Sequence, residues 1–178
     1  LNQLGGILRY DPSVENEELR WTHFTPPGAP IYSYGLGQSE DGNIWFGGGG
    51  LRRFDGKDWF KITEPEGLVS WIHGILGTED GLWVGTRTYG LYHYDGSEWS
   101  NFGVQDGLSN NRVDLILETL DGTLWVATDK GVSRFDGKTW ITHALPEGPV
   151  SSNVSLNQTR DGAIWIRSGL NAIRYKPE

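Results

Sequence analysis

Two columns of tryptophan, each recurring at intervals of about 40 residues, constrain the fold of this chain more than any other feature. The first column consists of Trp45, Trp83, Trp125 and Trp165. The second column consists of Trp21, Trp59, Trp99 and Trp140. Both run in step over most of the 178 residues, so the chain is built from about four copies of one unit. Self-similarity at a period of roughly 20–50 residues is typical of repeat architectures.

Each copy is predicted to form four short strands joined by tight turns. Asp-Gly pairs precede both tryptophan columns, beginning at Asp41, Asp80, Asp121 and Asp161 for the first and at Asp55, Asp95 and Asp136 for the second. Asp-Gly supplies the positive φ angles of a tight hairpin turn, whose twist matches that of the flanking strands. No stretch of about ten residues between these turns has a helical period. The Gly47–Gly50 run is expected to be the turn between strands two and three, not a phosphate-binding loop, because no helix follows it.

Four strands per unit, with periodic glycine and aromatic residues, are typical of the blade of a β-propeller. Neighbouring blades stack face to face, and large side chains fill the space between them. We therefore predict an all-β fold, a β-propeller of four-stranded antiparallel blades forming one domain over residues 1–178. The predicted blades are a partial one at 6–24, whole ones at 25–63, 64–103 and 104–143, and a partial one at 144–176.

The strand order predicts where the ring centre lies and how the chain ends. The first strand of each unit is expected to be innermost, at Ser33–Gln38, Ile72–Thr78, Val113–Glu118 and Val154–Gln158. Joining the two partial blades would complete a ring of four blades with one strand left over, and four is the lower limit for propellers. We therefore expect either part of a larger ring, of about seven blades, or self-association or binding of a protein partner through open blade edges.

The repeat resembles the two-component regulator propeller repeats of bacterial sensor proteins. The pattern that carries the resemblance is D-G-x-[IL]-W-[VIF], then a glycine-containing turn, then [GA]-[LVI]-x-[RH]-[FY]-D-G-x-x-W, with the linker GLSNNRVD at 107–114. The resemblance implies an extracytoplasmic module, periplasmic or secreted, that binds a ligand or mediates dimerisation. Through the I-W-F turn at 44–46, the chain has a weaker resemblance to the virginiamycin B lyase propellers.

Composition argues against several functional classes. There is no cysteine, and therefore no disulfide framework, zinc–cysteine site or thiol nucleophile. The net charge is −8 without a basic stripe, which disfavours nucleic acid and anionic membrane surfaces as partners. No apolar run approaches the roughly 18 residues of a membrane span, and residues 1–10 lack the pattern of a signal peptide. The chain contains no methionine, so we expect either a removed leader or a piece of a longer protein.

Most residues that could carry chemistry have a structural explanation within the repeat. The tryptophan columns are better explained by core packing than by stacking against a bound sugar. The aspartates in the turns are better explained by the backbone geometry of a hairpin turn than by calcium binding. His23 and His143 follow outer-strand tryptophans, and His93 occupies a column of arginines. No hydrolase, zinc-protease or phosphate-loop motif is present. We therefore predict no cofactor, no metal and no catalytic residue.

Residues that depart from their columns form the predicted binding site. They are Trp71, His73, Arg87, Tyr89, Asn111, Arg112 and Asp114. Trp71 and His73 begin an inner strand, and Arg87 and Tyr89 lie in the turn between strands two and three of the same blade. The residues at 111, 112 and 114 begin the next blade. All are expected on one face, opposite the Asp-Gly hairpins. Arginine and aromatic side chains suit a polar, ring-bearing or anionic ligand, such as a small molecule or a carbohydrate. An alternative role for Trp71 is to plug a wide ring centre.

The sequence favours a ligand-binding or sensing module over two alternatives. One alternative is a structural scaffold for assembly. The other is a propeller lyase or hydrolase, which would need a histidine and a carboxylate, usually with a metal, facing the channel. Because His73 is an isolated histidine on an inner strand, we do not predict an enzyme.

Overall fold

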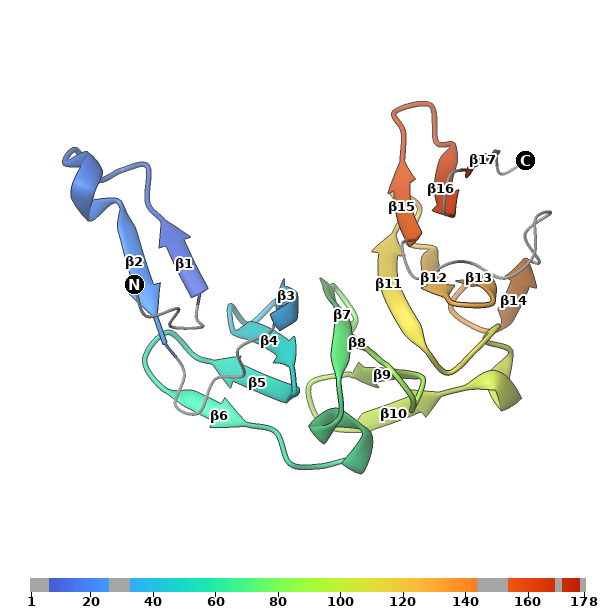
Figure 1. The fold of residues 1–178 in the computed structure, drawn as a ribbon, viewed down its shortest axis with the longest axis horizontal. Coiled ribbons are helices and arrows are strands. Elements are labelled where there is room, and N and C mark those ends of the chain that lie inside the picture. Colours follow the sequence, from blue (N-terminus) through green and yellow to red (C-terminus); the bar gives the residue numbers. More distant parts are fainter. Residues whose placement is uncertain (1–6, 26–32, 144–153, 169–170, 177–178) are drawn as a thin grey trace.

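The computed structural model describes residues 7–25, 33–143, 154–168 and 171–176, which form five antiparallel sheets arranged around an open arc (Figure 1). Blade 1 pairs β1 (Ile7–Tyr10) with β2 (Trp21–Phe24). Blade 2 contains β3 (Ser33–Gln38), β4 (Ile44–Gly48), β5 (Gly50–Phe54) and β6 (Trp59–Lys61). Blade 3 contains β7 (Ile72–Thr78), β8 (Gly81–Thr86), β9 (Leu91–Tyr94) and β10 (Trp99–Phe102).

The remaining elements complete the same pattern. Blade 4 contains β11 (Val113–Glu118), β12 (Leu124–Thr128), β13 (Gly131–Phe135) and β14 (Trp140–His143). Blade 5 contains β15 (Val154–Gln158), β16 (Ile164–Ser168) and β17 (Asn171–Tyr175). Short 3-10 helices are η1 (Glu17–Leu19), η2 (Glu66–Val69) and η3 (Val104–Asp106). The predicted fold class, all-β with four-stranded antiparallel blades, is confirmed.

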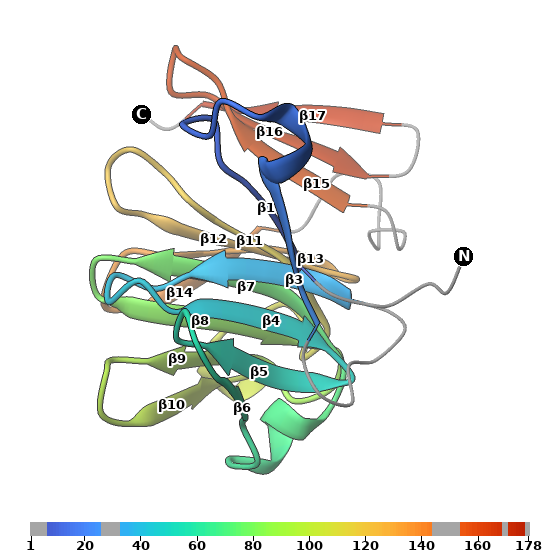
Figure 2. The ribbon, with the colours of Figure 1, turned by 90° about the vertical axis from the view of Figure 1, so that its left-hand side faces the viewer.

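Strands follow one another across each blade in chain order, as blade 2 shows in Figure 2. The first strands β3, β7, β11 and β15 line the inner side of the arc in Figure 1, as the sequence predicts. The prediction for the glycine run was partly wrong, because Gly47 and Gly48 belong to β4 and Gly50 to β5. Only Gly49 remains for the turn, and it forms an isolated bridge with Trp71.

The core lies at the interfaces between neighbouring blades. Trp45, Trp83 and Trp125 are only 3%, 3% and 2% exposed, so core packing explains their column. Each of them lies in a buried cluster with apolar residues of the following blade. Trp125, for example, packs with Val154, Ile164 and Ile166 of blade 5. The blades are therefore held together mainly by apolar contacts that each one makes with the next.

The Asp-Gly turns use their aspartates to order the backbone. Asp95 Oδ1 accepts hydrogen bonds from the backbone N–H groups of Ser97 at 2.7 Å and Glu98 at 2.8 Å. The Glu98 N–H, together with the hydroxyl and N–H of Ser97, lowers the pKa of Asp95 from 3.8 to about 2. Because this pKa is depressed in the folded state, the stabilisation is complete above about pH 4 and is lost as the pH falls through about 2.

The variant Asp95→Asn tests this acid sensitivity. Asparagine keeps the acceptor oxygen but cannot be protonated, so we expect a smaller decrease in Tm between about pH 4 and pH 2 than in the wild type. Asp95→Ala removes the acceptor and should lower Tm at every pH. Thermal unfolding followed by circular dichroism across this range is the measurement, and equal acid slopes for wild type and Asp95→Asn would contradict the assignment.

Three inner strands share a bulge at the same position. The register shifts between Ser33 and Gly35 in β3, between Ile72 and Gly74 in β7, and between Val113 and Leu115 in β11. The extra residues are Tyr34, His73 and Asp114. β15 pairs with β16 without such a shift. A bulge re-aims the side chain of its extra residue, and bulges are over-represented next to functional sites.

The two terminal blades do not share a strand. β1 and β2 form one sheet and β15, β16 and β17 another, and Figure 1 places these sheets on opposite arms of the arc. The described residues therefore do not close a ring within one chain. None of the helices described is long and apolar enough to span a membrane.

Candidate functional site

The bulges bring residues of three blades into one row. The Tyr34 and His73 rings lie 5.2 Å apart between centroids. His73 Nδ1 is 2.9 Å from Asp114 Oδ1. His73 is therefore not isolated, and the sequence interpretation that it stands alone was wrong. With the Nδ1 proton directed at the carboxylate, Nε2 of a neutral His73 is left as an acceptor.

Asp114 is the most enclosed charged group of the row. Its side chain is 11% exposed, and Arg112 Nε donates to its Oδ1 at 3.0 Å. Its second oxygen, Oδ2, is buried and has no hydrogen-bond partner among the described residues. A buried carboxylate oxygen without a partner is costly, so a donor supplied from outside would stabilise the site.

Trp71 and the turn between β8 and β9 lie beside this row. The backbone N–H of Arg87 donates to the carbonyl of Trp71 at 2.9 Å. Trp71 makes an edge contact with Tyr34, with ring centroids 5.9 Å apart. The Arg87 side chain is exposed and forms no ion pair or hydrogen bond with any residue that the structure describes. It is therefore available to a ligand.

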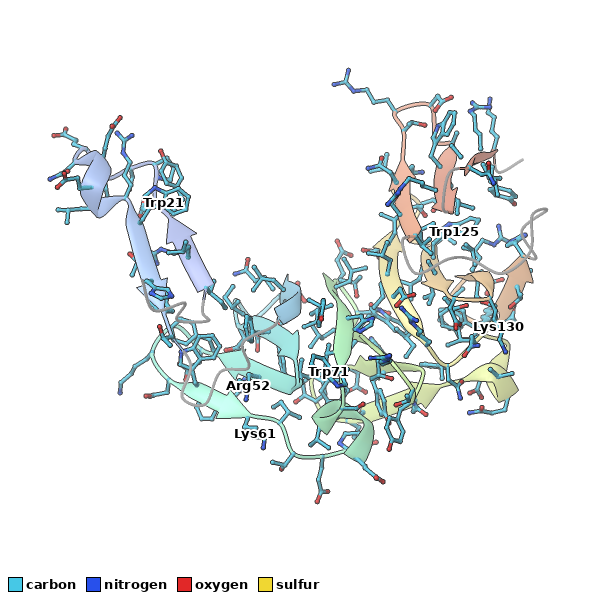
Figure 3. The ribbon with its side chains drawn as sticks, in the orientation of Figure 1. Trp21, Arg52, Lys61, Trp71, Trp125 and Lys130 are labelled. Atoms are coloured by element: carbon cyan, nitrogen blue, oxygen red, sulfur yellow. The ribbon has the colours of Figure 1, made fainter. Side chains whose placement is uncertain are left out.

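A hollow of about 510 Å³ opens at this end of the inner strands, and we call it the basic hollow. It is lined by Tyr34, His73, Arg87, Arg112, Asp114, Leu115, Val154 and Arg167. Four of the seven predicted site residues line it. Trp71, 39% exposed, does not line the hollow but contacts the lining residues Tyr34 and Arg87, and Figure 3 labels it near β7.

The other two predicted residues lie outside the lining. Tyr89 is 40% exposed in the same turn as Arg87, and its carbonyl accepts a hydrogen bond from Asn101. The Asn111 side chain accepts a hydrogen bond from the backbone N–H of Val104 at 2.9 Å, and its carbonyl accepts one from Gly90. Asn111 therefore orders the linker that precedes β11.

Sequence reasoning missed Tyr34 and Arg167. Tyr34 occupies the same bulge position as His73 and Asp114, so the alignment of the inner strands contained a signal for it. Arg167 stands at the position that Gly47, Gly85 and Ala127 occupy in the other blades. An arginine in a column of small residues is a departure of the kind that selected the other site residues.

The charge of the basic hollow is opposite to that of the whole chain. Arg87, Arg112 and Arg167 line the hollow together with a single carboxylate, Asp114, in a chain of net charge −8. Acidic residues gather at the other end of the inner strands, where Glu40, Glu79 and Glu118 border a shallow hollow. There partial burial, followed by the charges of Asp80 and Glu79, raises the pKa of Glu118. An anion is therefore favoured at the basic hollow.

Comparison with solved structures shows the fold. The chain is similar to the extracellular domain of a hybrid two-component system from B. thetaiotaomicron, with 22% identity and a TM-score of 0.75 over 88% of this chain and 24% of that one. A second extracellular domain from the same organism matches with 18% identity and a TM-score of 0.74, over 98% of this chain and 27% of that one. Virginiamycin B lyase from Staphylococcus aureus matches with 16% identity and a TM-score of 0.64, over 90% of this chain and 61% of the lyase chain.

The matched structures include extracellular domains of two-component systems and an enzyme. The chain spans about a quarter of the length of the two extracellular domains. No protein-family model and no curated protein matches the sequence. The propeller fold that the repeat pattern indicated is thus supported by structures of extracellular domains of two-component systems.

Proposed function

We propose that this chain is a ligand-binding module of an extracytoplasmic sensor and that the basic hollow is its binding site. The observation that carries the proposal is the row of inner-strand bulges. It directs Tyr34, His73 and Asp114 from three successive blades to a hollow whose charge is opposite to that of the chain. The fold likeness to extracellular domains of two-component systems supports the sensing role and the extracytoplasmic location.

The lining favours a polar ligand with a ring and an anionic group. Guanidinium groups form paired, charge-assisted hydrogen bonds with carboxylate and sulfate groups, and Arg87 is available for this contact. Tyr34 offers an exposed ring for stacking, and Asp114 Oδ2 can accept a hydroxyl proton in a hydrogen bond. Acidic monosaccharides and oligosaccharides combine these features, so they come first in a ligand screen, with their neutral counterparts alongside.

The variant Arg87→Ala tests the site. A hydrogen bond to a charged group contributes about 1.5–3 kcal/mol, so we expect affinity for an acidic sugar to decrease by roughly 10–100-fold. Tm should not change, because the Arg87 side chain has no partner within the described structure. Isothermal titration calorimetry and thermal shift are the measurements. Lys61→Ala removes the same charge from β6 on the outer side of the arc (Figure 3) and should bind like the wild type.

Trp71→Ala separates recognition from packing. If Trp71 contributes to binding through its contact with Tyr34, affinity decreases while Tm is preserved. If it serves only to fill the ring centre, Tm decreases and the folded protein binds as before. Equal affinity in wild type and Arg87→Ala would contradict the proposed site, and no response to any acidic or neutral sugar would favour the scaffold alternative.

A further inference from the structure

His73 lies where a change in its charge would alter what the basic hollow can bind. It belongs to β7, between β3 and β11, with a whole blade on either side (Figure 1). Its side chain is 17% exposed and lines the hollow. Nδ1 is 2.9 Å from Asp114 Oδ1, whereas Nε2 forms no hydrogen bond with any residue that the structure describes. Nε2 is therefore the nitrogen of His73 that is left for a ligand.

The surroundings of His73 combine three positive charges with one negative charge. The other ionisable side chains that line the hollow are Tyr34 of β3, Arg87 of the turn after β8, Arg112 and Asp114 at the start of β11, and Arg167 of β16. The strands β4 and β8 also pack against β7 and carry no ionisable side chain. Glu118, the other ionisable residue of β11, lies at the opposite end of that strand. The charge of His73 is thus set against these arginines and one carboxylate.

The two charge states of the imidazole offer a ligand opposite contacts. With one proton, on Nδ1 toward Asp114, the ring presents the lone pair of Nε2, which accepts a hydrogen bond from a hydroxyl group and repels a carboxylate. With two protons, the ring keeps its contact with Asp114 and presents a positively charged N–H donor. Histidine side chains change charge between about pH 5 and 8, so both states are reached under mild conditions.

We propose that His73 selects between neutral and anionic ligands of the basic hollow according to its protonation, an inference that rests on the proposed function. Protonated His73 favours a ligand with a carboxylate, and neutral His73 favours one with a hydroxyl group at the same point. The three arginines oppose a fourth positive charge in the empty hollow, and an anion beside Nε2 offsets that opposition. Anion and proton therefore enter together, and by linkage each strengthens the binding of the other.

Asp114 is the positioning residue of this device. A partly buried imidazolium is costly without a carboxylate beside it. Asp114 Oδ1 lies 2.9 Å from His73 Nδ1 and 3.0 Å from Arg112 Nε, and its side chain is only 11% exposed, so water screens these contacts little. The contact with Nδ1 also fixes the ring, because it leaves Nε2 as the nitrogen that gains or loses the proton.

The affinities of a matched pair of sugars, measured as a function of pH, test the proposal. Galacturonate and galactose differ at C6, which is a carboxylate in one and a hydroxymethyl group in the other, and a sugar carboxylate stays ionised above about pH 5. We expect the ratio of galacturonate to galactose affinity to rise about ten-fold between about pH 8 and pH 5.5, as for a hydrogen bond that gains a charge. Isothermal titration calorimetry in buffers of different ionisation enthalpy should show net proton uptake with galacturonate but not with galactose.

Three variants assign the effect to His73. His73→Asn keeps a neutral N–H donor for Asp114 but cannot become charged, so the affinity ratio should no longer depend on pH. His23→Asn removes an exposed histidine of β2 and should behave like the wild type. Glu118→Gln removes a carboxyl group whose pKa is raised by partial burial at the other end of β11, and it should also leave the pH dependence unchanged. Circular dichroism verifies folding, and His73→Gln replaces His73→Asn if that variant fails to fold.

The outcomes distinguish this inference from the proposed function. If galacturonate binds with the same affinity ratio at both pH values, or without proton uptake, the role of His73 is overturned and the basic hollow remains a binding site. A pH dependence that survives the replacement of His73 would overturn the role in the same way. If neither sugar binds at any pH, the proposed function fails, and this inference fails with it.

Discussion

Replacing Trp125 with alanine is expected to lower the free energy of unfolding by about 3–5 kcal/mol, because the side chain is almost wholly buried and leaves a cavity. Trp125 is 2% exposed and packs with Val132 of its own blade and with Ile164 and Ile166 of blade 5. Its ring also contacts Tyr175 at 5.2 Å. The substitution therefore removes the centre of the interface between blades 4 and 5. Equilibrium unfolding in urea gives the value.

Trp71→Ala is the matched control, since it deletes the same side chain from a position that is 39% exposed. Its expected cost is below about 1.5 kcal/mol, because far less apolar surface returns to water. Figure 3 labels both residues. Equal losses for the two variants would show that the tryptophan columns do not stabilise the interfaces between blades, and would contradict the packing described above.

The repeat made the fold predictable because packing imposes it on every blade. Each interface needs a large side chain from strand two, so Trp45, Trp83 and Trp125 recur at the blade spacing. Each hairpin turn needs a glycine with a positive φ angle and an aspartate that accepts backbone N–H groups, so Asp-Gly recurs as well. Both requirements apply to every blade. The tryptophan and the Asp-Gly pair therefore recur several times within a single sequence, and the repeat can be recognised from them.

The geometry of the candidate site was harder to predict from the sequence, because it depends on strand register. The residue types around Tyr34, His73 and Asp114 do not indicate a β-bulge. The bulges are seen only in the register with which β3, β7 and β11 pair with their neighbouring strands. Departure from the repeat selected His73, Arg87, Arg112 and Asp114, and all four line the basic hollow. The same criterion, applied to strand two, would also have selected Arg167.

A glycine on an inner strand also departs from the residue type found at the same position in the other blades, and this departure has a physical cause. Gly77 of β7 stands where the other inner strands have Gln38, Glu118 and Gln158. A Cβ atom at Gly77 would lie 1.8 Å from the backbone oxygen of Gln38, far inside contact distance. Gly37 of β3 also allows β3 and β7 to approach each other, since a Cβ atom at Gly37 would lie 2.6 Å from the Ile75 side chain. Strands β3 and β7 are therefore close because both carry glycine here.

Gly77→Ala is accordingly expected to destabilise the chain by about 3 kcal/mol, the upper end of the usual cost of overpacking. The atom in the way belongs to the backbone of β3, so relief requires β3 and β7 to separate, which opens the interface between blades 2 and 3. Chemical denaturation with urea measures the loss. Hydrogen exchange should show faster exchange in β3 and β7 than in β11.

Gly74→Ala provides the comparison on the same strand. A Cβ at Gly74 would meet the Ile116 side chain at 3.2 Å, and that side chain can move by a few tenths of an ångström. Its expected cost is below about 1 kcal/mol. If both substitutions cost the same, the close approach of β3 and β7 is not what requires glycine. A large loss confined to Gly77→Ala locates the requirement at the backbone of Gln38, where the first strands of blades 2 and 3 converge on the inner side of the arc.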